Sequence, residues 1–306
     1  MKIVSLFSVV RGYNIPIIIL AQYLAAIFIL SPNVRALEVL LDFHLFLIVL
    51  ASSVTIASGY IINSFYDSQK DLINKPNKTM LDRLVSQKTK LYVYFGLNFF
   101  VFFISMFISW RAVLFFSVYI FLIWFYSHKV KKYPIVGNLM AAFLAVLPFF
   151  GILLYYFKVE GLLENVSNEK YYVITAHAAF LFILILIREM IKDLENIKGD
   201  IVSNYQTIPV ILGEVFSKRI ITFLVFCSII PVYVLIEVYD VGYMDIYFYL
   251  SFIALIFFLL KLWKSNSKES YLLLHLIIKF IIVAGVFSIV LIKPSVLIHG
   301  KAVLSI

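Results

Sequence analysis

The sequence predicts an all-α protein that forms a polytopic membrane bundle. Of its 306 residues, 63% are hydrophobic and only 14% are charged, which a water-soluble domain of this length would not tolerate on its surface. Apolar stretches of roughly 20 residues, the length of a membrane-spanning helix, recur along the whole chain. We therefore expect about nine transmembrane helices, packed as a single integral membrane domain over residues 1–306.

The expected spans are residues 12–31, 43–63, 91–109, 112–127, 134–157, 171–188, 219–237, 246–263 and 271–292. The fourth span is short, and only the polar break at 109–111 separates it from the third, so eight and ten spans are alternatives. The first span lacks a small-residue cleavage site, so we interpret it as a retained helix and not as a signal peptide. The single cysteine, Cys227, predicts neither a disulfide nor a redox site.

Basic residues in the connections predict the orientation. With nine spans, one side of the membrane receives most of the lysine and arginine, in the connections at 67–90, 128–133, 188–219 and 261–268. The positive-inside rule makes that side cytoplasmic, and in a bacterium the membrane would be the inner membrane. The net charge of +9 is thus a sign of topology, which predicts no nucleic-acid partner, and nothing predicts an obligate protein partner.

Two acidic clusters follow apolar spans on this side. In the stretch NSFYDSQKD, Asn63, Asp67 and Asp71 are four residues apart, so on a helix they form one stripe about 12 Å long. In the stretch REMIKDLENIKGD, Asp193 and Asp200 are nearly eclipsed, Asn196 lies about 60° to one side, and Glu195 points away. Gly199 is a candidate end of this second helix, and we expect a long polar connection over 189–218.

Carboxylates at this spacing are typical ligands of hard divalent cations. Mg²⁺ uses one or two carboxylates and keeps positions for phosphate oxygens, so two facing clusters could hold a diphosphate between metal ions. The alternative is that the acids are solvated helix ends. Two clusters on one side, each in helical register and each beside basic residues, favour the metal site.

In these residues the chain resembles the intramembrane aromatic-type prenyltransferases of the UbiA superfamily. Asn63, Asp67 and Asp71 match the first acidic motif of that family, KDLENIKGD and QTIPVILG match the second, and Arg11 and Asn14 match the opening of its first helix. The stretch 126–151 is most similar to the geranylgeranylglycerol-phosphate geranylgeranyltransferase branch. The sequence departs from the family at Asn196, where many relatives have Asp, and at KTMLDRLVS, which replaces the usual Pro and Ser-Gly.

The resemblance implies a Mg²⁺-dependent transfer of a prenyl group, such as geranylgeranyl, from an allylic diphosphate to the hydroxyl of a glycerol phosphate lipid. The distribution of basic residues places this active site on the cytoplasmic side, and we expect it to be in contact with membrane lipids. The implied metal ligands are Asn63, Asp67, Asp71, Asp193, Asn196 and Asp200, of which the four aspartates are catalytic. The substrate-binding candidates are Asn63, Lys78, Lys131, Arg188, Lys192, Arg11 and Asn14.

Two other functions compete with this one. The acceptor could be an aromatic ring, such as 4-hydroxybenzoate or a naphthoate, which needs no second anion site. A glycerol phosphate acceptor brings a second anion, for which Lys131 and Lys132 with Arg188 are the candidate cations. A cation-coupled transporter would place its ionisable groups near the bilayer midplane, whereas these acids lie at helix ends.

Three further polar residues fall inside apolar spans. Lys279 is a candidate functional group or a lysine that snorkels to the membrane surface. His177 and His275 have no matched ligands in the sequence, so we expect packing or a hydrogen bond for each.

Overall fold

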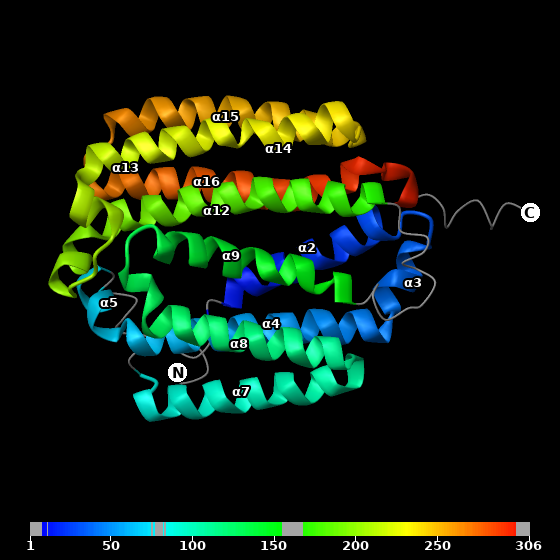
Figure 1. Ribbon diagram of the computed structural model, residues 1–306, viewed down its shortest axis with the longest axis horizontal. Coiled ribbons are helices and arrows are strands. Elements are labelled where there is room, and N and C mark those ends of the chain that lie inside the picture. The colour runs from blue at the N-terminus through cyan, green and yellow to red at the C-terminus, as the bar shows by residue number, and fades with distance from the viewer. Residues whose placement is uncertain are drawn as a thin grey trace, which may run out of the picture.

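The computed structural model describes residues 8–10, 12–74, 76, 82, 84–154 and 168–297. Every regular element among these residues is a helix, which confirms the all-α prediction (Figure 1). In this part of the chain, 7 helices are long and apolar enough to cross a membrane, and two shorter apolar helices cover Ile15–Leu30 and Val136–Gly151. The fold is therefore that of a multi-pass membrane protein, although the predicted number of nine spans is not confirmed.

The helices follow the predicted spans closely. The first half contains η1 (Gly12–Asn14), α2 (Ile15–Leu24), the π-helical η2 (Ala25–Leu30), α3 (Ala36–Leu41), α4 (Phe43–Tyr66), α5 (Ser68–Asn74), α7 (Gln87–Ile108), α8 (Trp110–His128), η3 (Val130–Lys132) and α9 (Val136–Gly151). The second half contains α12 (Asn168–Val202), α13 (Ile208–Cys227), α14 (Ile229–Tyr233), η4 (Val234–Val238), η5 (Gly242–Met244), α15 (Asp245–Lys264), α16 (Lys268–Ser288), η6 (Ile289–Ile292) and η7 (Pro294–Leu297).

Polar side chains at the helix starts explain several boundaries. The side chain of Ser109 accepts a hydrogen bond from the backbone N–H of Ala112 at 3.1 Å, so this residue caps α8. The predicted polar break at 109–111 is therefore a real break between two helices. Asp42 caps α4 in the same way, by accepting from the backbone N–H of Leu45 at 2.8 Å. Such caps satisfy backbone donors that a helix start leaves without a partner.

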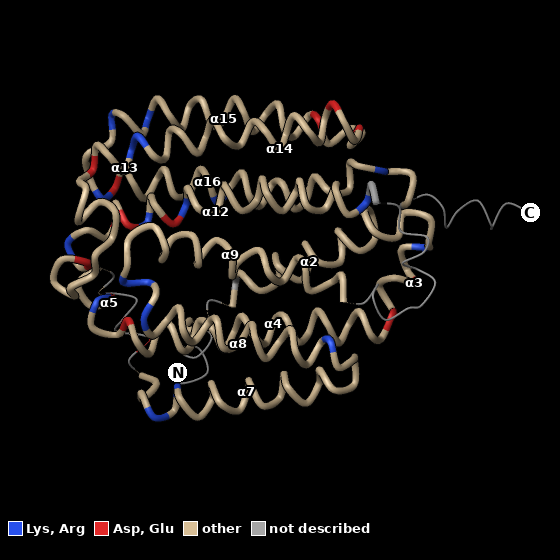
Figure 2. The backbone as a smooth tube through the Cα atoms, in the orientation of Figure 1, with Lys and Arg blue, Asp and Glu red and all other residues tan. Residues whose placement is uncertain are grey.

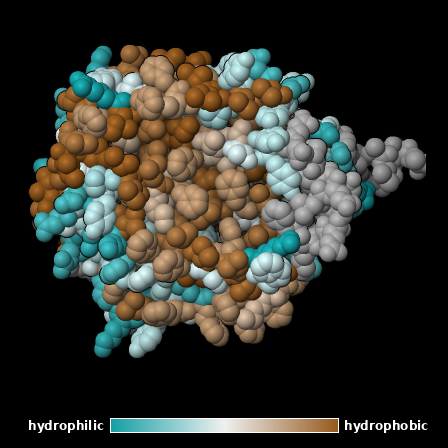
Figure 3. All heavy atoms as spheres, viewed as in Figure 1, coloured by the Kyte–Doolittle hydropathy of each residue, from teal (hydrophilic) through white to brown (hydrophobic). Residues whose placement is uncertain are grey.

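The helices pack in two groups, and α2 contacts both of them. Helix α4 packs against α7 and α8, while α12 packs against α9, α13 and α16, and α2 contacts both α4 and α16. Large apolar side chains remain exposed on the outer helices α7 and α15, as expected for surfaces that face lipid. Hydrophobic residues also cover the middle of the face that Figure 3 shows.

Charged residues gather at one end of the bundle, at the left of Figure 2. We call this the polar end. Helix α4 ends there, and α12 connects there to α13. The predicted long polar connection over 189–218 is wrong, because α12 continues to Val202 and α13 starts at Ile208. Gly199 lies inside α12, so it does not end the helix.

Candidate active site

The first acidic motif lies where α4 passes into α5. Asp67 breaks the regular helix, with φ −89° and ψ 4°. Helical hydrogen bonds nevertheless continue across it, from the N–H of Asp67 to the carbonyl of Asn63 and from the N–H of Asp71 to the carbonyl of Asp67, both at 2.9 Å. The three side chains therefore keep the four-residue spacing that the sequence predicts, although two helices carry them.

The second motif lies on one stripe of α12. Asp193 accepts a hydrogen bond from Nδ2 of Asn138 on α9 at 2.7 Å. Asp200, whose side chain is 0% exposed, accepts from Oγ1 of Thr207 at 3.1 Å. Because both carboxylates have partners on other elements, the second motif is fixed in place by the fold around it.

Two lysines contact the acidic motifs, and one of them joins the first motif to the second. Lys131 on η3 places Nζ 2.7 Å from Oδ1 of Asp67, and it donates to Oδ1 of Asn63 at 3.0 Å. Lys70 on α5 places Nζ 2.6 Å from Oδ1 of Asp200 on α12. Tyr205 completes the link, since its hydroxyl donates to Asp67 at 2.9 Å and its ring lies 4.2 Å from Nζ of Lys70. The two acidic motifs therefore face each other across a layer of cations.

These contacts favour the charged forms of Asp67 and Lys70. Burial alone would raise the pKa of Asp67, but the charges of Lys131 and Lys70 outweigh it and hold that pKa below its usual value. Burial would lower the pKa of Lys70, but Asp200 and Asp67 outweigh it and raise that pKa. Both groups are therefore ionised at neutral pH, as an ionic site for a diphosphate requires.

A close approach of α5 to α12 sets the distance between the motifs. The backbone N–H of Gly199 donates to Oδ1 of Asn74 at 3.2 Å, and a Cβ atom at Gly199 would overlap Nδ2 of Asn74. Lys268 at the start of α16 donates to the backbone carbonyl of Asn74 at 2.5 Å. A side chain at position 199 would therefore force the Asn74 side chain, and with it the contact of α5 with α12, to shift.

A cavity of about 330 Å³ opens below this layer. Its walls come from α2, α4, α8, α9, α12 and α16, and most of its lining is apolar. A smaller polar pocket lies beside it, lined by Lys131, Asn138 and Asp193, and the two pockets share Tyr126, Ala141 and Glu189. The arrangement suits a molecule with an anionic head at the polar end and an apolar tail in the bundle.

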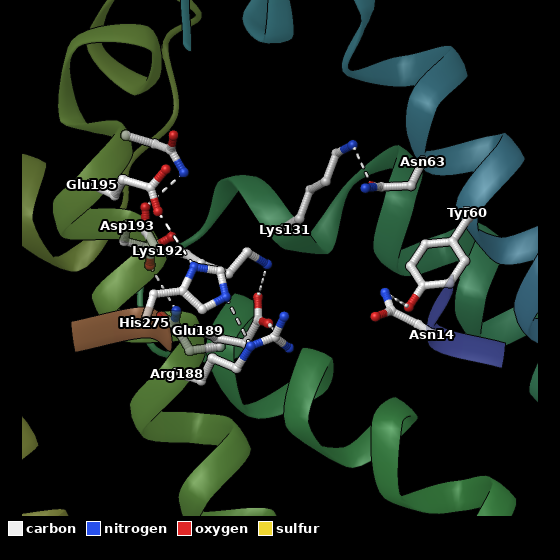
Figure 4. A network of polar contacts seen from close by, with 12 residues as sticks. Asn14, Tyr60, Asn63, Lys131, Arg188, Glu189, Lys192, Asp193, Glu195 and His275 are labelled. Atoms are coloured by element: carbon white, nitrogen blue, oxygen red, sulfur yellow. Dashed lines mark hydrogen bonds and ion pairs between the residues drawn. The ribbon is translucent and has the colours of Figure 1, made fainter. Parts of the chain in front are cut away.

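Figure 4 shows residues that line the two pockets, most of them predicted from the sequence. Lys131 and Asn63 lie on one side, and Arg188, Glu189, Lys192 and Asp193 of α12 lie on the other. Asn14 also lines the cavity, and its Nδ2 donates to the hydroxyl of Tyr60 at 3.3 Å. Arg11 and Lys78, two of the predicted substrate-binding residues, lie outside the described residues.

Asn196 and Glu195 differ in their surroundings. Asn196 donates from Nδ2 to the backbone carbonyl of Lys192 at 2.7 Å, and its Oδ1 is buried without a hydrogen-bond partner among the described residues. Glu195 faces His275 of α16, with Oε2 3.4 Å from Nδ1. The histidine accepts a hydrogen bond from Nε of Arg188 at 2.9 Å, which is the kind of role that the sequence predicts for it.

Several site residues were missed by reasoning from the sequence alone. Lys70, Asn138, Glu189, Thr207 and Tyr205 all contact a predicted residue or line one of the two pockets. The sequence does contain a signal for two of them. Glu189 precedes Asp193 by one helical turn, and Lys70 lies between Asp67 and Asp71.

The donor set fits a hard divalent cation that binds together with a phosphate ligand. No three acidic, histidine or cysteine side chains in the described ranges lie close enough to hold a metal ion by themselves. Mg²⁺ needs no such cage, because it takes one or two carboxylates and completes its shell with phosphate oxygens and water. The carboxylates of Asp67, Asp193 and Asp200 are oxygen ligands of this kind, and so is the free amide oxygen of Asn196.

Fold and site together define a helical membrane protein with paired acidic motifs over an apolar cavity. The UbiA prenyltransferase family matches residues 19–289, so the chain belongs to this family. The resemblance noted in the sequence is thereby confirmed, and the protein is a membrane prenyltransferase.

Curated relatives and solved structures agree with this family. The chain is 29% identical over 300 residues to "Digeranylgeranylglyceryl phosphate synthase" of Methanobrevibacter smithii, covering 92% of this chain and 98% of that protein. It is 28% identical to the protein of the same name from Sulfurisphaera tokodaii, covering 76% of this chain and 79% of that one.

Two solved structures share the fold. One is described as digeranylgeranylglyceryl phosphate synthase in membranes, with a TM-score of 0.69, 20% identity and coverage of 96% of this chain and 99% of that chain. The other is a UbiA homolog from Archaeoglobus fulgidus bound to DMAPP and Mg²⁺, with a TM-score of 0.59, 15% identity and coverage of 99% of both chains.

Proposed function

We propose that the protein transfers a geranylgeranyl group from its diphosphate to the hydroxyl of a glycerol phosphate lipid in the presence of Mg²⁺. The observation that carries this proposal is the layer of paired charges above the apolar cavity. Lys131 and Lys70 already lie against Asp67 and Asp200, so cations and acids for a metal-bound diphosphate are present together. The names of the curated relatives support the glycerol phosphate acceptor.

The site residues have two different proposed roles, metal binding and diphosphate binding. Asp67, Asp71, Asp193 and Asp200, with the amide oxygens of Asn63 and Asn196, are the proposed metal ligands. Mg²⁺ bound there supplies Lewis-acid stabilisation of the leaving diphosphate. Lys131 and Lys70 lie beside these carboxylates, where their ammonium groups would bind the diphosphate oxygens.

The cavity holds the prenyl tail and excludes water from the reacting carbon. Tyr126 lines both pockets, which places this residue between the polar layer and the apolar cavity. An aromatic ring at that point can stabilise positive charge on the allylic carbon as the diphosphate leaves. Below it, apolar residues of α2 and α9 line the part of the cavity that would hold the prenyl tail.

The acceptor is tested directly with purified protein. Geranylgeranyl diphosphate and Mg²⁺ should yield an ether product with geranylgeranylglyceryl phosphate, and chelation of the metal should stop turnover. Mass spectrometry identifies the product. Prenylation of 4-hydroxybenzoate or a naphthoate with no ether product would reject the proposed acceptor and favour the aromatic one, while the membership of the family would stand.

We also propose that the polar end faces the cytoplasm, because it carries most of the basic residues. In a Cys227→Ala background, a cysteine at the exposed Lys264 should resist a membrane-impermeant maleimide in intact cells and react after lysis. A cysteine at Glu38, exposed on α3 at the opposite end, should react in intact cells. The reverse labelling pattern would overturn the orientation.

A further inference from the structure

Cations around the site form two groups on opposite walls. Lys70 and Lys131 belong to the layer of paired charges, where they contact Asp200 and Asp67. Arg188, Lys192 and Lys279 instead line the large cavity, from α12 and α16. Figure 4 shows Arg188 and Lys192 across the site from Lys131. The second group is therefore placed to bind an anion other than the one that Lys70 and Lys131 serve.

The charge of this second wall favours an anionic ligand. Three cations and one carboxylate, Glu189, are the charged side chains among the described residues that line the cavity. Glu189 contacts both neighbours on α12, with Oε2 2.5 Å from Nζ of Lys192 and Oε1 3.9 Å from Nη1 of Arg188. The lining of the cavity therefore contributes more positive than negative side chains, which favours an anionic ligand over a neutral one.

We propose that Arg188, Lys192 and Lys279 form the binding site for the phosphate of the acceptor lipid. This inference rests on the proposed function and names the part of the site that recognises the acceptor. A phosphate monoester carries a charge of about −1.5 to −2 at neutral pH, which complements the excess positive charge of this wall. Arg188 is kept from the sequence-based hypothesis. Lys192 and Lys279 replace Lys131 and Lys132, because Lys131 contacts Asp67 and neither of those two lysines lines the large cavity.

The position of Lys279 fits a phosphate with a lipid tail. On the same helix, Ile282, Val283 and Val286 continue the cavity lining away from the polar end. An acceptor whose phosphate contacts Lys279 could therefore lay its own apolar chain along α16. The donor diphosphate would lie on the opposite side, at the layer of paired charges.

His275 and Glu195 position Arg188 for this role. Nε of Arg188 donates to Nε2 of His275, so the neutral histidine carries its proton on Nδ1, which faces Glu195 at 3.4 Å. Only Nε of the guanidinium is used in this contact. Its terminal nitrogens stay available for Glu189 and for a phosphate, which a guanidinium binds through two parallel hydrogen bonds.

Steady-state kinetics with two acceptors test the proposal. Arg188→Gln and Lys279→Met should each raise the KM for geranylgeranylglyceryl phosphate by about 10-fold or more, the effect of one lost charge-assisted contact. The KM for geranylgeranyl diphosphate should change less than about 2-fold. With geranylgeranylglycerol, which lacks the phosphate, both variants should match the original protein. Lys264→Met is the matched control, because this lysine is exposed and lies away from the cavity.

A binding measurement separates recognition from chemistry. Equilibrium binding of labelled geranylgeranylglyceryl phosphate, without donor and without Mg²⁺, should weaken in the same two variants. His275→Leu should also raise the KM for this acceptor and leave kcat near the original value, whereas His275→Gln should restore the KM, because glutamine can both accept and donate. Folding of every variant is checked by its melting temperature in detergent.

Three outcomes would overturn the assignment. The first is that Arg188→Gln and Lys279→Met raise the KM for geranylgeranylglycerol as much as the KM for geranylgeranylglyceryl phosphate. The second is that these variants raise only the KM for geranylgeranyl diphosphate. The third is that both variants fold and bind geranylgeranylglyceryl phosphate as tightly as the original protein does. If the original protein makes no ether product at all, the proposed function itself fails, and this inference fails with it. Normal turnover by the original protein together with unaffected variants rejects only the phosphate site.

Discussion

Asp67→Asn should reduce kcat by about 10³-fold or more. The variant keeps an oxygen that accepts from Tyr205 but loses the negative charge of the carboxylate that we propose as a metal ligand. Loss of a group that only supports a metal ligand costs about 10- to 100-fold, and loss of the ligand charge should cost more. The kcat at saturating Mg²⁺ and geranylgeranyl diphosphate is the measurement.

The same substitution should also destabilise the fold. The Lys131 side chain is 6% exposed, so neutralising Asp67 leaves a nearly buried ammonium without its anionic partner. Breaking a buried ion pair from one side costs about 3–5 kcal/mol. The double variant Asp67→Asn with Lys131→Met should recover much of that stability and none of the activity. Chemical denaturation in detergent together with kcat separates the two effects.

Glu237→Gln is the matched control for this prediction, because Glu237 is exposed on η4 at the opposite end of the bundle. It should leave kcat and stability unchanged. A folded Asp67→Asn protein with near-original, Mg²⁺-dependent turnover would show that Asp67 does not hold the metal.

Hydropathy predicted the helices well, because the length of an apolar stretch can be seen in the local sequence alone. Each of the nine predicted spans overlaps a helix that the structure describes, although residues 155–157 of the fifth span lie outside the described residues. The polar break at 109–111 is a helix start capped by Ser109. The error at 189–218 has a physical cause. Hydropathy drops there because α12 becomes polar, but the helix continues to Val202, since contacts with α5, α9 and α13 hold it at the polar end.

Positions that a fixed spacing sets within one helix were also predictable, while the roles of these residues stay predictions. Asp67 and Asp193 follow from helical register within one segment, and Lys131 from its position before the fifth predicted span. The contact of Lys70 with Asp200 joins residues from different halves of the chain, and so does that of Tyr205 with Asp67. Register within one helix carries no information on which distant element packs against it, so these contacts could not be predicted.

Gly199 illustrates the same limit and gives the second large prediction. The sequence suggests a helix end, whereas in the structure the missing side chain lets Asn74 of α5 contact the backbone of α12. Asn74 is 5% exposed and its Oδ1 is held by the N–H of Gly199, so it has little room to move away from a new methyl group. We therefore expect Gly199→Ala to push α5 away from α12.

This displacement should affect activity more than stability. Helix α5 carries Lys70 and Asp71, and a shift of about 1 Å in groups that orient a substrate can cost about 10²-fold in rate. Overpacking of this kind costs about 1–3 kcal/mol in stability. Gly199→Ala should therefore lower kcat by about 10²-fold and raise the Mg²⁺ concentration for half-maximal activity, because the two acidic motifs move apart.

Two further variants make the test specific. Gly96→Ala on α7 is the matched control, because a Cβ atom there meets nothing within 4 Å, and it should leave kcat unchanged. Asn74→Ala combined with Gly199→Ala should recover more activity than Gly199→Ala alone, since it removes the atoms with which the new methyl group would clash. If Gly199→Ala keeps the original kcat and Mg²⁺ dependence, the contact between α5 and α12 does not set the distance between the acidic motifs. If the double variant is no more active than Gly199→Ala, the loss arises from the backbone of α12 and not from the displacement of α5.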